Sequence, residues 1–152
     1  MSGEPEDLSG LRYAAGVDQQ AGALAWIQED GIRRFWIVTS RRTKRWVLPK
    51  GGIDDGMTPP EAAAQEAFEE AGVIAKPQRD PIGSYSVAKI RPPLIWTVQV
   101  ALYPMQVEQV LDDWKEIRQR DRKLVSIEEA AELIAEPEIT ALIRSALPDL
   151  TD

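Results

Sequence analysis

Three glutamates, Glu66, Glu69 and Glu70, are the residues of this sequence best suited to chemistry. They are spaced i, i+3 and i+4. At about 100° per residue of an α-helix these positions fall within an arc of about 100°, so all three are predicted to point to one side. Carboxylates this close repel one another, and a hard divalent cation such as Mg²⁺ relieves the repulsion. The spacing indicates a metal site, whereas a solvated acidic helix face is the alternative for such a pattern taken alone.

The neighbouring residues predict where the helix begins and ends. Thr58 is placed to cap it, Pro59 takes the first helical position, and Glu61 completes a capping box three residues after the cap. Gly72 is predicted to stop the helix. The side that carries the glutamates also carries Ala62 and Ala63, which are predicted to leave open space there. The opposite side is predicted to be buried, through Ala64, Phe68 and Ala71.

A glycine-rich turn and a basic loop precede the helix. Residues 46–48 predict a short strand that Pro49 ends, and Gly51 and Gly52 allow the backbone to bend and approach a ligand closely. The basic loop at residues 40–45 is expected beside the acidic helix, where its cations could hold the outer phosphates of a substrate. A merely solvated loop is the alternative. With the second basic cluster at residues 118–123, the predicted substrate-binding residues are Arg41, Arg42, Lys44, Lys50, Lys89, Arg91 and Arg120.

In this context the chain resembles the Nudix hydrolases. Their signature runs Gly, five residues, Glu, seven residues, then Arg-Glu-apolar-x-Glu-Glu-x-Gly-apolar. Met57 stands where the first Glu belongs and Gln65 where the Arg belongs, so an expected ion pair is replaced by an uncharged contact. Losing both partners is better tolerated than stranding one charge. The matching residues are Gly51, Glu66, Glu69, Glu70, Gly72 and Val73.

The resemblance covers roughly residues 20 to 147 and implies an α+β fold, an α/β/α sandwich around a mixed sheet. The second half of the chain narrows the resemblance to one branch of the family. The motif Leu111-Asp-Asp-Trp114, a basic run, a short strand and then Ile127-Glu-Glu-Ala130 looks like the diphosphoinositol polyphosphate phosphohydrolase branch. The implied reaction is hydrolysis of a diphosphate linkage in a small-molecule polyphosphate.

The catalytic roles that the resemblance implies rest on the three glutamates. Glu66 and Glu70, one helical turn apart, are assigned as the principal ligands of Mg²⁺, with Mn²⁺ as the alternative ion. Glu69 is either a further ligand or the base that deprotonates the attacking water. A backbone carbonyl of Lys50 or Gly51 is expected to contribute to the same metal ion.

The number of predicted cationic side chains suits a substrate that carries several phosphates. Diphosphoinositol polyphosphates and dinucleoside polyphosphates such as diadenosine hexaphosphate both satisfy this, and ADP-ribose ranks third. Tyr85 and Trp96 are candidates for stacking on an adenine, although core packing is favoured for Trp96. A non-catalytic Nudix-fold sensor is the alternative that Met57 and Gln65 favour. Processing of RNA 5′ ends is a third candidate function, which fits the net negative charge of the protein less well.

Composition excludes other chemistries. The absence of cysteine and histidine excludes disulfides, thiol catalysis, Ser-His triads and the usual zinc sites. A net charge of −7 argues against a nucleic-acid partner. No apolar run spans a bilayer and no leader is evident, so we expect a cytoplasmic protein without membrane contact. The sequence identifies no protein partner.

At 152 residues and 43% hydrophobic, the chain is expected to form one domain over residues 11–152 after a flexible segment at 1–10. A hairpin is predicted from strands at 21–27 and 32–39, joined at Asp30-Gly31. The strand predicted at 94–107 contains Pro104, which indicates a sheet edge or a bulge. Further strands are predicted at 82–89 and 124–125, and helices at 126–135 and 138–147.

Overall fold

An eight-stranded mixed sheet runs through the middle of the molecule, and the computed structural model describes it within residues 10–150. Its main path has the order β3-β2-β1-β7-β5, while β4 pairs with β1, β6 with β7 and β8 with β2. Apart from Gly10, the predicted flexible segment lies outside the described residues. The strands are β1 (Arg12–Glu29), β2 (Ile32–Thr39), β3 (Trp46–Val47), β4 (Lys50–Gly52), β5 (Val73–Pro77), β6 (Gly83–Arg91), β7 (Leu94–Val110) and β8 (Arg122–Val125).

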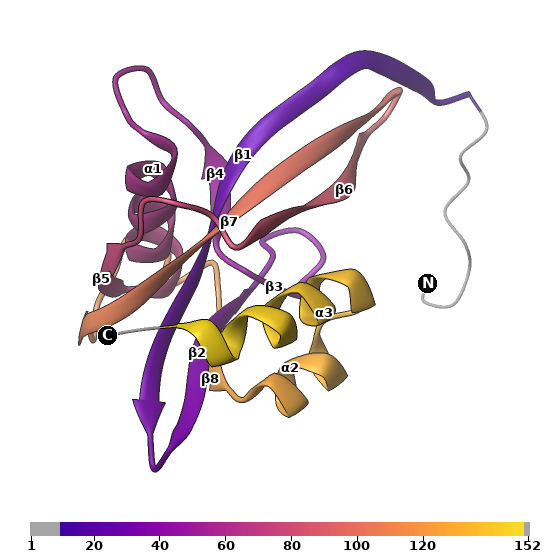
Figure 1. Ribbon diagram of the computed structural model, residues 1–152. Helices are drawn as coiled ribbons and strands as arrows, with labels where there is room; N and C mark the ends of the chain where they lie inside the picture. The colour runs from indigo at the N-terminus through magenta and orange to yellow at the C-terminus, as the bar shows by residue number, and fades with distance from the viewer. Residues whose placement is uncertain (1–9, 151–152) are drawn as a thin grey trace.

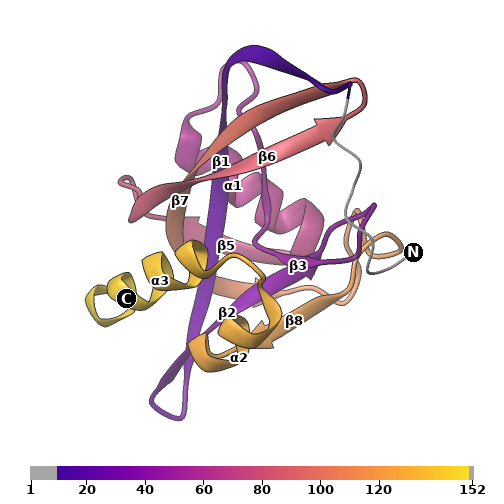
Figure 2. The same ribbon diagram turned by 90° about the vertical axis from the view of Figure 1, so that its right-hand side faces the viewer.

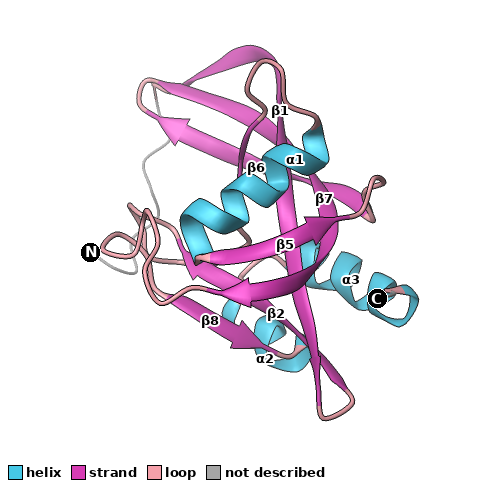
Figure 3. Ribbon diagram, turned by 90° about the vertical axis from the view of Figure 1, so that its left-hand side faces the viewer, coloured by secondary structure: helices cyan, strands magenta, loops and turns pink. Residues whose placement is uncertain are grey.

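Helices cover both faces of this sheet. On one face lies α1 (Pro59–Glu66), which continues into a wider π-helical turn, η1 (Ala67–Ala71). On the other lie α2 (Ile127–Leu133) and α3 (Pro137–Ala146), followed by the short η2 (Leu147–Asp149) (Figure 3). Each face has its own apolar cluster, one built on alanines of the α1 layer and one on larger side chains under α2 and α3. The predicted α/β/α sandwich is confirmed.

The first hairpin forms where the sequence predicts it. Glu29 pairs with Ile32, and the two turn residues Asp30 and Gly31 both have positive φ, 53° and 76°, as a type I′ turn requires. The prediction that its first strand begins at residue 21 is wrong, because β1 starts at Arg12. Residues 12–20 are mostly exposed, so no apolar pattern marks them. Residues 12–20 pair with β7, which holds them in the sheet, and β6 pairs with the same part of β7. Together these segments form an extension of the sheet (Figures 1 and 2).

Pro104 does not mark a sheet edge. It is buried within β7, which pairs with β1 on one side along most of its length. On the other side β7 pairs with β6 up to Leu102 and with β5 from Met105 onward. The missing N–H of Pro104 falls where β7 changes partners, so no ladder hydrogen bond is lost there.

The C-terminal helices are as predicted and support the sheet from behind. Ser126 and Glu129 form a reciprocal capping box at the start of α2. The apolar stripe of α3 is buried through Ile139 and Ile143. Within the described residues, none of the helices is long and apolar enough to cross a membrane.

Candidate active site

The helix that carries the glutamates begins and ends where the sequence predicts. The Thr58 side chain accepts a hydrogen bond from the Glu61 backbone, and the Glu61 carboxylate accepts one from the Thr58 backbone N–H, at 2.9 Å. Gly72 ends the helix in the left-handed conformation, with φ 67°. Between Thr58 and Gly72 the helix changes from α to π geometry at Ala67, directly after Glu66. Nothing in the sequence pattern indicated this change.

The predicted faces of the helix are wrong for three residues. Ala62 and Ala63, predicted to lie on an open side, are buried against the sheet, and Phe68, predicted to be buried, is 40% exposed. The predicted burial of Ala71 is confirmed. Alanine allows the helix to approach the sheet closely, so the side with the small residues is the packed side. The carboxylate of Glu70 lies on this packed side and is only 5% exposed. The acidic cluster is therefore held between helix and sheet instead of on a bare surface.

Glu66 and Glu70 form a close pair whose carboxyl groups hydrogen-bond to each other. Burial raises the pKa of Glu70 to about 9, and the hydrogen bond to Glu66 adds to the rise. Burial also raises the pKa of Glu66. The backbone of Gly51 lies against the pair, because a Cβ added at Gly51 would come within 2.5 Å of Glu66 Oε1. The glycine turn and the Glu66 side chain are therefore in close contact.

Glu69 points away from this pair. Its carboxylate accepts hydrogen bonds from Gln65 Nε2 at 2.6 Å and from Lys115 Nζ at 3.2 Å. The hydrogen bond from Gln65 lowers the pKa of Glu69, and Lys115 lowers it further. A π turn advances each residue by a smaller angle than an α turn, which brings Glu70 over Glu66 and turns Glu69 aside. The prediction that three carboxylates share one side therefore holds for two of them.

Arg120 lies beside Glu70 but is bound more tightly elsewhere. Its Nε donates to Glu116 Oε1 at 2.6 Å, its Nη1 donates to the Thr39 carbonyl at 3.0 Å, and its Nη2 lies 3.6 Å from Glu70 Oε2. Its side chain is 10% exposed. Arg120 was predicted as a phosphate ligand, whereas its partner Glu116 was not predicted, although the i, i+4 spacing of the two residues is a signal for pairing.

Lys50 lies near the carboxylate pair. Its Nζ donates to Gln20 Oε1 at 3.4 Å. Burial lowers its pKa to about 8, and the nearby Lys89 charge lowers it further, while Glu70 and Glu66 act in the opposite direction. The charge of Lys89 thus acts on Lys50, whereas Arg91 is exposed at the tip of the β6–β7 hairpin.

The basic loop is tied to the segment that carries Arg120. Lys44 Nζ donates to the Gln119 carbonyl at 2.9 Å, and Arg41 Nη1 donates to Gln119 Oε1 at 3.4 Å. Arg42 is exposed in the same loop. The loop therefore contacts Gln119, the neighbour of Arg120, a link that the sequence did not indicate, and its position beside the acidic helix stays a prediction.

The same segment closes the end of the catalytic helix. Carbonyls at the end of η1 have no partner within the helix. Glu69 O accepts from the Glu116 backbone at 3.1 Å, Ala71 O from Arg122 Nη1 at 2.8 Å, and Gly72 O from the Leu111 backbone at 2.8 Å. The Arg122 guanidinium lies 4.0 Å from the ring centroid of Trp114 and 5.3 Å from that of Trp36. Sequence analysis missed this role of Arg122.

The aromatic residues proposed for adenine stacking are not available for it. Tyr85 is 6% exposed and belongs to the core under α3, and Trp96 packs against the same core. The prediction for Tyr85 is wrong because the β6 position that it occupies faces the helices. Core packing, favoured for Trp96, is confirmed.

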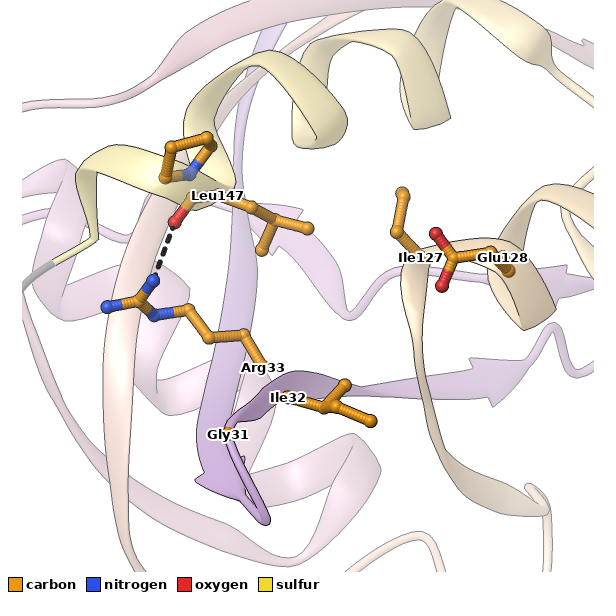
Figure 4. A pocket seen from close by; sticks show the side chains of 7 residues that line it. Gly31, Ile32, Arg33, Ile127, Glu128 and Leu147 are labelled. Atoms are coloured by element: carbon orange, nitrogen blue, oxygen red, sulfur yellow. Dashed lines mark hydrogen bonds between the residues drawn. The ribbon is translucent and has the colours of Figure 1, made fainter.

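Two surface hollows lie away from the carboxylate pair. One, of about 350 Å³, is lined by Met57, Gln65 and apolar side chains such as Phe68 and Ile74. The two departures from the Nudix signature thus line one hollow. The other, of about 260 Å³, lies between the β1–β2 hairpin and the C-terminal helices, where Arg33 Nη1 donates to the Leu147 carbonyl (Figure 4). It contains none of the predicted site residues.

The donors at the carboxylate pair suit a divalent cation that prefers oxygen. Two carboxylates from successive helical turns and an adjacent glycine backbone match the few protein ligands that Mg²⁺ takes besides water and substrate phosphates. A cation of charge 2+ would offset the repulsion between the Glu66 and Glu70 carboxylates, whose pKa values burial raises. Among residues 10–150 no group of three or more metal-binding side chains converges.

Comparison with known proteins assigns the chain to a family. The family description of the NUDIX domain matches residues 18–148, nearly all of the described sheet and helices. The chain belongs to the Nudix hydrolase family. This Nudix protein is 32% identical over 101 residues to Nudix hydrolase 12, mitochondrial, of Arabidopsis thaliana, a match that covers 64% of the chain and 50% of the relative. The chain therefore spans about half the length of that relative.

Other relatives agree with this assignment. The protein is 28% identical over 121 residues to diphosphoinositol polyphosphate phosphohydrolase 3-beta of Bos taurus, covering 78% of the chain and 70% of the relative. Its fold is similar to that of a C. elegans Ap4A hydrolase, with a TM-score of 0.64, 21% identity and coverage of 90% and 100%. A NUDIX hydrolase from Nitrosomonas europaea aligns with a TM-score of 0.66, 16% identity and coverage of 88% and 90%. These structural matches establish the fold.

Proposed function

We propose that this Nudix protein hydrolyses a phosphoanhydride bond in a polyphosphorylated small molecule with the help of Mg²⁺. The observation that carries the proposal is the buried Glu66–Glu70 pair, packed against the Gly51 backbone and flanked by Lys50 and Arg120. Burying two carboxylates side by side is costly unless a cation joins them. A metal ion at this point would neutralise charge on the phosphates and activate water.

The proposed role of each residue follows from its position. Glu66 and Glu70 would hold the metal, with a backbone carbonyl of Lys50 or Gly51 beside them. Hydrogen bonds from Gln65 and Lys115 lower the pKa of Glu69 and keep it ionised, and it would serve either as a further ligand or as the base that deprotonates the attacking water. Lys50 and Lys89, together with Arg41, Arg42 and Lys44, would bind the outer phosphates. Arg91 would contact the distal part of a long substrate.

The substrate class follows from the cations and the aromatic residues. Lys50, on which the charges of Glu66 and Glu70 act, and Arg120, which lies 3.6 Å from Glu70, are cations beside the carboxylate pair, which suits a ligand with several phosphates. Tyr85 and Trp96 pack in the core, which removes the stacking platform that a nucleobase would use. We therefore place diphosphoinositol polyphosphates first, dinucleoside polyphosphates second and ADP-ribose third. A similarity to a diphosphoinositol polyphosphate phosphohydrolase supports this order.

Mg²⁺ is proposed as the physiological ion, with Mn²⁺ as a substitute, since both accept carboxylate oxygen. We also propose the cytoplasm as the compartment, while relatives named as mitochondrial show that the family is not confined to it. The net charge of −7 supports a small-molecule partner over nucleic acid.

The test is release of phosphate or nucleotide with Mg²⁺ from three substrates: a diphosphoinositol polyphosphate, a diadenosine polyphosphate and ADP-ribose. Glu66→Gln and Glu70→Gln are each expected to lower turnover by about 10²-fold or more while the protein remains folded. Turnover equal to wild type in either variant would contradict the proposal.

The second candidate function is a non-catalytic sensor that binds a phosphorylated ligand. It is favoured by Met57 and Gln65, which replace a charged pair of the Nudix signature and line one hollow. Ligand binding without turnover of any of the three substrates would support the sensor. Restoring the pair with Met57→Glu and Gln65→Arg would then be expected to restore hydrolysis.

A further inference from the structure

Glu116 and Arg120 form an ion pair whose geometry bears on Glu70. The hydrogen bond from Arg120 Nε to Glu116 Oε1 is short, 2.6 Å, whereas Arg120 Nη2 stays 3.6 Å from Glu70 Oε2, beyond ordinary hydrogen-bond distance. The side chains of Arg120, Glu116 and Glu70 are 10%, 12% and 6% exposed. Because water is largely excluded, the two carboxylates compete directly for one guanidinium group.

The backbone fixes this arrangement from two directions. The Glu116 carbonyl accepts hydrogen bonds from the backbone of Gln119 at 2.9 Å and of Arg120 at 3.1 Å, so the two side chains leave one tight turn. The Glu116 backbone N–H donates to Glu69 O, which anchors that turn to the helix carrying Glu70. On the far side, Arg120 Nη1 is held by the Thr39 carbonyl.

We propose that Glu116 is a positioning residue that holds the Arg120 guanidinium off Glu70 and so keeps the Glu70 carboxylate free for a divalent cation. The inference rests on the metal-binding role proposed above for Glu66 and Glu70. Without Glu116, a shift of less than about 1 Å would bring Arg120 into a direct charge-assisted bond with Glu70, at about 2.8 Å. The guanidinium would then occupy the oxygen that the metal needs.

Binding of Mn²⁺ to the whole protein, measured by calorimetry without substrate, tests this directly. Glu116→Ala is expected to weaken Mn²⁺ binding by about tenfold, the size typical for a residue that orients a metal ligand. In the Arg120→Gln background the same substitution is expected to change Mn²⁺ affinity by less than about twofold, because the competing cation is gone. Asp113→Ala is the control for loss of a negative charge, because Asp113 is an exposed acid in the same segment. This variant should leave the Mn²⁺ affinity unchanged.

A merely structural or electrostatic role of Glu116 predicts another pattern. It would weaken Mn²⁺ binding equally in both backgrounds, and this result would overturn the proposal, as would an unchanged affinity in Glu116→Ala. Should Glu116→Ala not fold, Glu116→Asp replaces it in both backgrounds with the same expectations, since it keeps the charge and withdraws the carboxylate by one methylene. Equal Mn²⁺ affinity of wild type and Glu70→Gln would instead overturn the metal site itself, which separates the two failures.

Discussion

Gly51→Ala offers the sharpest test of how the glycine turn and the glutamates work together. A Cβ at Gly51 would lie 2.5 Å from Glu66 Oε1 and 2.8 Å from Glu66 Oε2, whereas ordinary contact begins at 3.4 Å. The Glu66 carboxylate must therefore move by about 0.9 Å. Because it is the end of a flexible side chain, the fold can accept this shift, and we expect a free energy of unfolding within about 1 kcal/mol of wild type. A displacement of about 1 Å at a reacting centre costs about 10²-fold in rate.

The matched control is Gly52→Ala. A Cβ at Gly52 would meet no atom within 4 Å, and neither glycine has a positive φ, so backbone strain does not separate the two variants. Thermal unfolding, Mn²⁺ affinity and Mg²⁺-dependent hydrolysis would be measured for both. We expect Gly52→Ala to resemble wild type, and Gly51→Ala to fold but to lose turnover. Full activity in Gly51→Ala, or equal loss in both variants, would refute the reasoning.

Three further predictions follow from charge and contact. The pKa of Glu70 is raised from 4.5 to about 9, so the metal-free folded state binds more protons than the unfolded state between these pH values. The stability of the metal-free protein should therefore fall as pH rises from about 4.5 to 9. Thermal unfolding across this range would show the fall in wild type and a smaller fall in Glu70→Gln. Lys50 has a pKa of about 8, so KM should rise above pH 8 in wild type; Lys50→Met should raise KM at pH 7 and remove that rise, and a flat wild-type profile would contradict this. Arg122→Met removes the hydrogen bond to Ala71 O and both tryptophan contacts, and should cost about 2–3 kcal/mol in urea unfolding; a change below about 0.5 kcal/mol would show that Arg122 does not secure the helix end.

Local signals were sufficient for most elements and for the family. Capping boxes at Thr58 and Ser126, the Asp30-Gly31 turn and the Gly72 stop all depend on residues a few positions apart, so the sequence predicted them and the structure confirms them. The glutamate spacing within the Nudix signature identified the family before the fold was known. In each case the physical cause is a backbone group or turn that a neighbouring residue satisfies.

Tertiary structure decided which side of the helix is buried, how far β1 extends and where Arg120 is bound. Small alanines allow close approach to the sheet, so the side that looked open is the packed side. The π turn after Glu66 separates Glu69 from Glu70, and β7 holds the polar half of β1 in the sheet. These outcomes depend on contacts between residues far apart in the chain, which periodicity cannot reveal. The sequence by itself determined which residues carry the Nudix signature, and packing decided which of them come together.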